Sequence, residues 1–147
     1  MTRQADVAVE RFAKGFSCSQ AVFSAFSPAL GLPADTALRI ASAFGGGIGR
    51  RGEVCGAVTG ALMALGLATG HADNDETSKA ATYELVDKFL RRFQAAHKSV
   101  TCRTLIGHSM DTSEGLERAR EAGVFKTICP HLVADAAEIV ASILERK

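Results

Sequence analysis

The sequence predicts an all-α protein, a single-domain helical bundle with a central apolar helix around residues 54–67. Apolar residues recur at helical spacing along most of the chain, and residues typical of helix caps precede these segments. The alternation of apolar and polar residues that is typical of a strand is absent. Because 147 residues suffice for one hydrophobic core, we expect residues 1–147 to form one domain.

The N-terminal part of the chain is expected to begin with a helix over residues 3–14. Ser17 and Gln20 then form a candidate capping box, in which each side chain bonds to a backbone amide of the other residue. This box places Cys18 at the first position of a second helix, which ends near Pro28.

Three further helices follow in the middle of the chain. One begins after Pro33 with Asp35 as the expected N-cap, and the next is the central apolar helix. A long amphipathic helix is predicted over residues 76–97, with Asp73 and Glu76 as a candidate capping pair.

The C-terminal part is predicted to contain shorter elements and one long helix. Thr101 can cap a short segment that begins at Cys102. Residues 109–115 are expected to form a loop and residues 116–122 a short helix. Pro130, at the first helical position, is expected to open the terminal helix.

A glycine-rich loop precedes the central helix and contains Arg50 and Arg51. Glycine permits backbone conformations with positive φ, so the amides of this loop can fold inward as a nest for an anion. The two arginines favour that interpretation because they add positive charge, although a flexible connection is the alternative. The glycines are Gly45, Gly46, Gly47, Gly49 and Gly52.

Two glycines in the first turns of the central helix, Gly56 and Gly60, remove side chains from one of its faces. A cofactor or another helix could then approach the helix backbone closely. Both residues are therefore candidates for cofactor binding together with Arg50 and Arg51, and tight helix packing alone is the alternative.

Each of the four cysteines lies at, or one residue from, an expected helix start. At such a position the pKa of a thiol can fall from about 8.5 to roughly 3.5–7.5, because unpaired amides and the helix dipole stabilise the thiolate. Thiolates are the ligands of iron–sulfur clusters and of many zinc sites. We expect the four to meet around a redox centre, and the alternative is that they are small buried hydrophobic residues. They are Cys18, Cys55, Cys102 and Cys129.

The segment Cys55-Gly56-Ala57-Val58-Thr59-Gly60 resembles the Cys-Gly-Ala-x-x-Gly motif of the four-cysteine redox-active protein family labelled C_GCAxxG_C_C. Cys18 before the motif, and Cys102 and Cys129 after it, follow the order of that family. The resemblance implies a bacterial or archaeal protein that holds a prosthetic group such as an iron–sulfur cluster.

Three functions are consistent with these residues. The first is electron transfer by an iron–sulfur cluster, or another metal centre, held by the four cysteines. The second is thiol–disulfide exchange without a cofactor, with Cys55 as the attacking thiolate and Cys18 as a second catalytic cysteine. The third is a structural zinc site in an interaction module. His108 and His131 are candidates to replace a thiolate or to donate to a cluster sulfur.

The charge and the chain ends suggest which partners to expect. A formal net charge of +1, with both signs spread along the chain, excludes a basic stripe for nucleic acid. The N-terminus carries no secretory or twin-arginine leader, and residues 54–69 are too short to span a membrane. We expect a cytoplasmic protein with a redox partner protein, which could form a homodimer.

Overall fold

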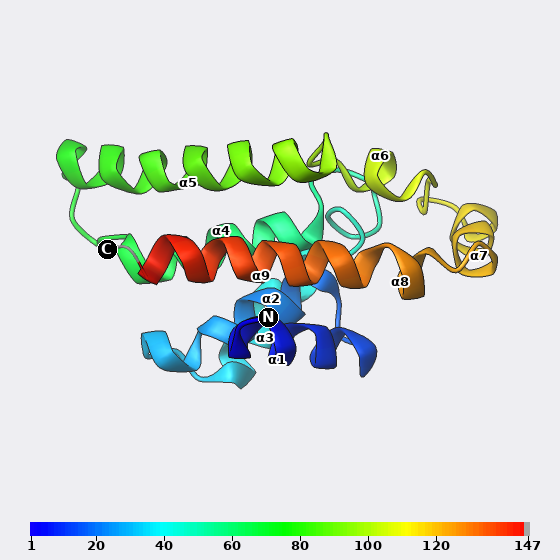
Figure 1. Cartoon of the computed structure of the whole chain (residues 1–147), viewed down its shortest axis with the longest axis horizontal. Coiled ribbons are helices and arrows are strands. Elements are labelled where there is room, and N and C mark those ends of the chain that lie inside the picture. The colour runs from blue at the N-terminus through cyan, green and yellow to red at the C-terminus, as the bar shows by residue number, and fades with distance from the viewer. Residues whose placement is uncertain (146–147) are drawn as a thin grey trace.

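The computed structural model describes residues 1–145, and its fold is all-α, as predicted (Figure 1). Residues 146–147 of the predicted domain lie outside the described residues. Among residues 1–145 there is no strand, and extended pairing is limited to an isolated bridge between Val54 and Thr101. The α-helices are α1 (Arg3–Ala13), α2 (Cys18–Phe26), α3 (Ala34–Ala41), α4 (Gly56–Thr69), α5 (Glu76–His97), α6 (Cys102–Ile106), α7 (Ser113–Glu121), α8 (Val124–Thr127) and α9 (Cys129–Glu145), with short 3₁₀ helices η1 (Pro28–Leu30) and η2 (Ser42–Phe44).

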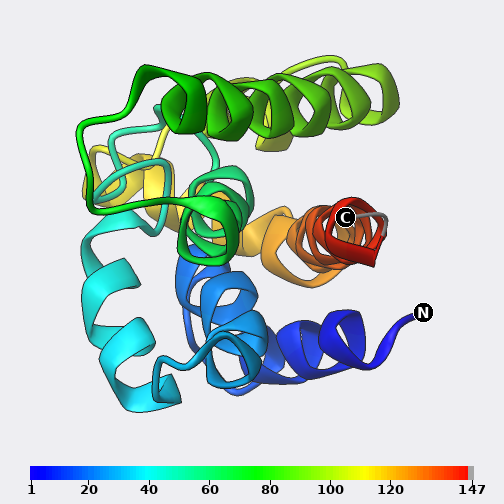
Figure 2. The same cartoon turned by 90° about the vertical axis from the view of Figure 1, so that its left-hand side faces the viewer.

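Helix α4 is the centre of the fold, which confirms the predicted central helix. Figure 2 shows it between α5 and α2, with α9 beside it, and it packs against all three. It begins at Gly56 instead of Val54, because Val54 is part of the bridge with Thr101. Small and apolar residues on all sides allow neighbours to approach from every direction. The buried residues of α4 are Gly56, Ala57, Val58, Gly60, Ala61, Ala64 and Leu65.

The long helices α5 and α9 cover α4 with complementary apolar faces. Phe89 and Phe93 are the buried residues of α5, and their rings stack with centroids 5.8 Å apart. At the end of α5, His97 Nε2 lies 2.8 Å from Asp135 Oδ2 of α9. The polar contact fixes the end of α5 against α9 where the apolar contact ends.

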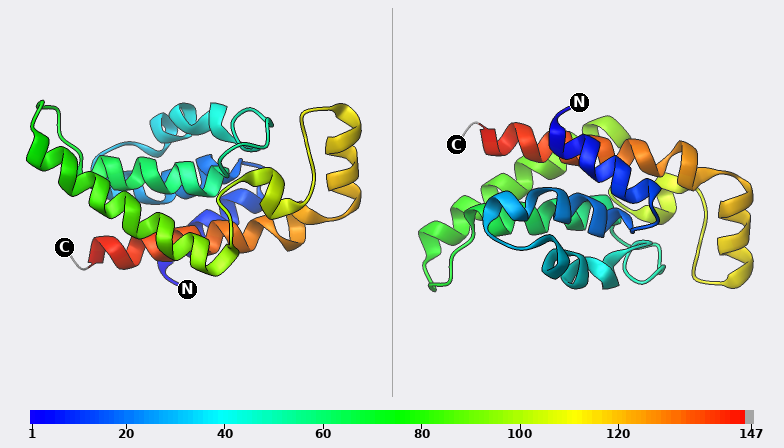
Figure 3. Two further views of the ribbon diagram at one scale, coloured as in Figure 1. Left: turned by 90° about the horizontal axis from the view of Figure 1, so that it is seen from above. Right: turned by 90° about the horizontal axis from the view of Figure 1, so that it is seen from below.

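The C-terminal segment Val124–Glu145 is long and apolar enough to cross a membrane, by length and composition only. A core helix passes the same test, and here α9 packs against α1, α4 and α5. Its buried residues lie at helical spacing and include Leu132, Val133, Ala136 and Val140. Figure 3 shows the far end of α9 at one end of the molecule and α7 at the other.

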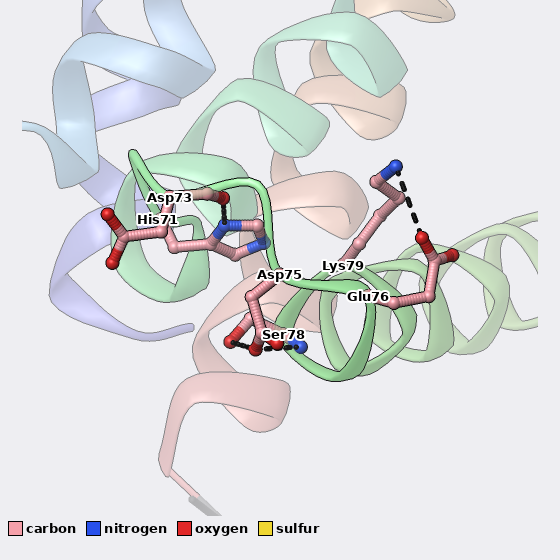
Figure 4. A network of polar contacts seen from close by, with 6 residues as sticks. All are labelled: His71, Asp73, Asp75, Glu76, Ser78 and Lys79. Atoms are coloured by element: carbon pink, nitrogen blue, oxygen red, sulfur yellow. Dashed lines mark hydrogen bonds and ion pairs between the residues drawn. The ribbon is translucent and has the colours of Figure 1, made fainter.

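Two helix caps differ from the prediction. Helix α3 has Pro33 as its N-cap, and Asp35 lies within its first turn. The N-cap of α5 is Asp75 instead of Asp73, because the Asp75 carboxylate accepts bonds from the backbone N (3.0 Å) and the hydroxyl (2.6 Å) of Ser78 (Figure 4). The capping box of Ser17 and Gln20 is confirmed.

The segment between α6 and α9 is more helical than predicted. Helix α7 begins at Ser113, inside the expected loop, because the Thr112 hydroxyl accepts a bond from the Gly115 amide. Helix α8, which follows Gly123 at φ +75°, is not among the predicted elements. Helix α9 then begins at Cys129, and Pro130 is its second residue.

Candidate redox site

The structure brings the four cysteines to one cavity of about 70 Å³. Three of them are the first residues of helices α2, α6 and α9, and the fourth is the N-cap of α4. Three are buried, and Cys18 is half-buried. Four segments that are far apart in the sequence therefore each contribute a cysteine to one cavity, and the role of these cysteines as ligands stays a prediction.

The convergence of Cys55 and Cys102 depends on backbone pairing between the chain before α4 and the chain before α6. The Cys55 amide donates to the Val100 carbonyl, and the Cys102 amide donates to the Glu53 carbonyl, each at 2.7 Å. The bridge between Val54 and Thr101 lies between these two bonds. This pairing holds the starts of both helices side by side.

Cys18 and Cys129 form a second, closer pair. The S–H group of Cys18 donates a hydrogen bond to the sulfur of Cys129. The capping box of Ser17 and Gln20 fixes the start of α2, while α9 packs against both α1 and α2. The two N-terminal ends therefore meet across a helix interface.

Glycine is required on two sides of the cavity. A Cβ atom on Gly47 would lie 2.7 Å from Cys102 Cβ and 2.7 Å from the Glu53 amide nitrogen. A Cβ atom on Gly56 would lie 3.1 Å from Cys18 Cβ and 2.9 Å from the Ser19 nitrogen. Real Cβ atoms rarely approach other atoms this closely, so both glycines give the cysteines room. The rest of the wall is Phe12, Gly46, Ile106, Met110, Phe125 and Leu132.

Gly60 lies deeper in the interface between α2 and α4 and does not line the cavity. A Cβ atom there would lie 2.6 Å from the Ser19 carbonyl oxygen. Of the two alternatives that the sequence leaves open for Gly60, helix packing is the one that this geometry supports. Gly56 combines helix packing with a place at the cavity.

The glycine-rich loop forms a left-handed turn, with positive φ at every residue from Gly46 to Arg50. The amides of residues 48–53 donate to carbonyl groups of residues 43–48. The amides of Gly49 and Gly52 are therefore not free to take part in the expected anion nest, which corrects the prediction for these two of its five glycines. Arg50 faces a larger groove next to the cavity, and Arg51 is exposed and lines neither.

The expectation that all four thiols have a lowered pKa is wrong for three of them. Burial raises the pKa of Cys55 to about 11, although bonds from the Ala57 and Val58 amides act in the opposite direction. Burial also raises the pKa of Cys102 to about 12, helped by the charges of neighbouring cysteines. Desolvation of the charged form therefore outweighs the helix terminus.

The hydrogen bond between Cys18 and Cys129 shifts their two pKa values in opposite directions. The hydrogen bond from the Cys18 S–H group lowers the pKa of Cys129, and the same bond raises the pKa of Cys18. Burial and the nearby cysteine charges raise the pKa of Cys18 further. In the metal-free protein, Cys129 is thus the preferred thiolate of the group.

The two candidate histidines do not reach the cavity. His108 Nδ1 lies 2.9 Å from the Ile106 carbonyl oxygen, and His131 is exposed on α9. Neither lines the cavity, so among the residues that the structure describes, cysteine is the only titratable type in its wall. Among residues 1–145, no three side chains of His, Cys, Asp or Glu are gathered closely enough to hold one metal ion.

Fold and site together define an all-α protein in which four cysteines, each at the start of a different helix, line one cavity. Residues 16–143 match the family described as "Putative redox-active protein (C_GCAxxG_C_C)", a range that contains all four cysteines. The chain belongs to this family of redox-active proteins. No curated protein and no solved structure gave a significant match.

Proposed function

We propose that the four cysteines ligate an iron–sulfur cluster and that the protein transfers electrons through it. The observation that carries the proposal is the convergence of four thiols from four helix starts on one cavity. Four cysteine thiolates are the usual ligand set of [2Fe–2S] and [4Fe–4S] clusters. When bound, the cluster would supply one-electron chemistry that the protein side chains lack.

The chain can stabilise the negative charge of such a centre. The positive ends of the helix dipoles of α2, α4 and α9 point toward the thiols. The Ala57 and Val58 amides already donate to Cys55, and amides that donate to ligand sulfurs raise the reduction potential of a cluster. Apolar side chains of Ile106, Met110 and Leu132 line the cavity and lower the polarity around the thiols.

Apart from the hydrogen-bonded pair of Cys18 and Cys129, which would have to separate, the spacing of the thiols favours a cluster over a zinc ion. The charges of the other three cysteines all raise the pKa of Cys18, so the four groups are close enough to interact. Nevertheless, no three of them are gathered as ligands of one ion. A cluster keeps its thiolates farther apart than a single ion does, because several iron and sulfide atoms lie between them.

The test is the metal and sulfide content of the protein purified without oxygen. We expect brown protein with iron and acid-labile sulfide in equal amounts, and loss of both in each Cys→Ser variant. Met110→Leu is the matched control, since it changes a wall residue of similar volume without removing a thiol. Colourless wild-type protein after reconstitution with iron and sulfide would refute the proposal.

The contact between Cys18 and Cys129 supports a second candidate, thiol–disulfide exchange. The Cys129 thiolate would attack a disulfide of a partner protein and release one partner thiol. Cys18, after losing its proton, would displace the second thiol and leave a Cys18–Cys129 disulfide. The lowered pKa of Cys129 supports it as the attacking residue. The pKa of Cys55, raised to about 11, argues against the predicted role of Cys55 as the attacking thiolate.

Peptide mapping after mild oxidation of the metal-free protein tests this candidate. We expect loss of two thiols per chain and one disulfide that joins Cys18 to Cys129. Cys102→Ser, which removes a thiol outside the pair, should leave this disulfide intact. An oxidised protein in which the disulfide joins other residues, or in which all four thiols persist, would rule it out.

A further inference from the structure

A groove of about 900 Å³ opens beside the cysteine cavity, and we call it the outer groove. Its volume lies within the range of pockets that hold small molecules. Its walls come from the end of α1, the glycine-rich loop, α7, α8 and the start of α9. The family motif and the cysteines do not account for it, since none of the cysteines lines it.

The inner surface of the outer groove is largely apolar. Phe12 and Phe16 come from the N-terminal part of the chain, and Met110, Leu116 and Phe125 come from the part before α9. Phe16 has 37% of its surface exposed. The apolar body of a ligand could bury these rings.

The charged residues that line the outer groove are all cations. They are Arg50, Arg120 and Lys126, and no aspartate or glutamate of the described chain lines it. Arg120 lies 3.9 Å from Glu117, at the limit of an ion pair. Within residues 1–145, neither Arg50 nor Lys126 is found in an ion pair, so both charges are available to a ligand.

The outer groove and the cysteine cavity share part of their walls. Phe12, Gly46, Met110 and Phe125 line both. A molecule in the outer groove would therefore lie one layer of side chains away from the thiols. Access to the cysteines from this side passes between the same four residues.

We propose that the outer groove binds a small organic anion, an apolar or aromatic body that carries a carboxylate or sulfonate, next to the cysteines. The apolar walls take the body, and Arg120, Lys126 and Arg50 take the anionic group. This binding does not depend on whether the cysteines hold a cluster or form a dithiol.

The probe is 1-anilinonaphthalene-8-sulfonate, and its uncharged analogue N-phenyl-1-naphthylamine is the control ligand. We expect saturable binding of the sulfonate that weakens with salt, and weaker binding of the uncharged analogue. Equal affinity for both dyes would contradict the assignment of an anion site. So would a salt-independent affinity for the sulfonate.

Variants locate the binding. We expect Arg120→Gln with Lys126→Gln to raise the dissociation constant of the sulfonate by about three- to tenfold, the scale of partly exposed charge pairs. Two controls should leave it unchanged or tighter: Glu117→Gln, which removes the partner of Arg120, and Lys88→Gln on α5, which contributes nothing to the groove. Unchanged binding in the double variant would overturn the proposal.

A second measurement tests the proximity to the thiols. In the reduced metal-free protein, saturating sulfonate should slow the alkylation of Cys129, the thiol whose pKa is lowered, by iodoacetamide about severalfold, whereas an unchanged rate would refute the shared access. The iron and sulfide content of the double variant should equal that of the wild type. A failure of the anion site is thereby distinguished from a failure of the cluster.

Discussion

Gly60 of α4 and Ser19 of α2 meet through their backbones: a Cβ atom on Gly60 would lie 2.6 Å from the Ser19 carbonyl oxygen. Helices α2 and α4 each present a cysteine at their N-terminal end. The close approach of the two helices therefore positions Cys18 and Cys55 at the same cavity.

The first prediction concerns this contact. Gly60→Ala should lower the free energy of unfolding by about 1–3 kcal/mol, because the new methyl group meets backbone atoms that cannot move aside. Chemical denaturation monitored by circular dichroism measures it. Gly66→Ala in the same helix is the control, since a Cβ atom there meets nothing within 4 Å. It should stabilise the protein by about 0.5–1 kcal/mol, and equal effects of both variants would refute the argument.

The second prediction concerns the glycine-rich loop. Gly47→Ala should destabilise the protein and lower its iron and sulfide content, because the methyl group would press on Cys102 and on the Glu53 backbone. Gly49→Ala has a positive φ as well, but its Cβ atom would meet nothing within 4 Å. It should show only the backbone strain, about 1–2 kcal/mol, and keep the cofactor content. A normal centre in Gly47→Ala would contradict the prediction.

The third prediction concerns the order of thiol reactivity in the reduced metal-free protein. Near neutral pH, iodoacetamide should modify Cys129 before Cys55 and Cys102, because only the pKa of Cys129 is lowered. Cys18→Ala removes the hydrogen-bond donor and should shift the alkylation profile of Cys129 to higher pH. Mass spectrometry of peptides across a pH series gives the order. An unshifted Cys129 profile in that variant would show that the bond is unimportant.

The fourth prediction is a loss of stability at alkaline pH. Cys55 and Cys102 have pKa values of about 11 and about 12 in the folded chain, against about 8.5 for a free thiol. The contribution of these two protonated thiols to the free energy of unfolding is fully present below about pH 8.5. It is lost as the pH rises toward the pKa values of the folded chain, because only the unfolded chain ionises in that range. Melting temperatures of the metal-free protein should fall across this window. The fall should be smaller in a Cys55→Ala and Cys102→Ala double variant, and an equal fall would contradict it.

The fifth prediction distinguishes the two candidate caps of α5. Asp75→Ala should lower the melting temperature, since Asp75 accepts both bonds from Ser78, whereas Asp73→Ala should leave it nearly unchanged. The pKa of Asp75 is lowered by these bonds. The difference between the two variants should therefore be present above about pH 4 and shrink as the pH falls through the lowered value. A larger effect of Asp73→Ala would restore the sequence-based assignment.

Local sequence determined most of the secondary structure. Apolar periodicity and cap residues were sufficient for α1, α2, α4 and α5, and the capping box at Ser17 is a purely local arrangement. Predictions failed where several polar residues compete for one cap. Asp73 and Asp75 are chemically alike, and only the final position of Ser78 selects between them.

The sequence also placed each cysteine at or next to a helix start, from neighbours such as Ser17 and Pro130. Thr101 is the N-cap of α6 but makes no side-chain cap bond, and its bridge with Val54 holds that helix start in place. Tertiary structure alone decided which thiols meet and which of them ionise. Cys18 and Cys129 come together only because α9 packs against α1 and α2, and their hydrogen bond is the main reason that the pKa of Cys18 rises. The pKa values of Cys55 and Cys102 rise because the same packing removes water. A helix terminus is a local property, whereas desolvation depends on everything that surrounds the sulfur.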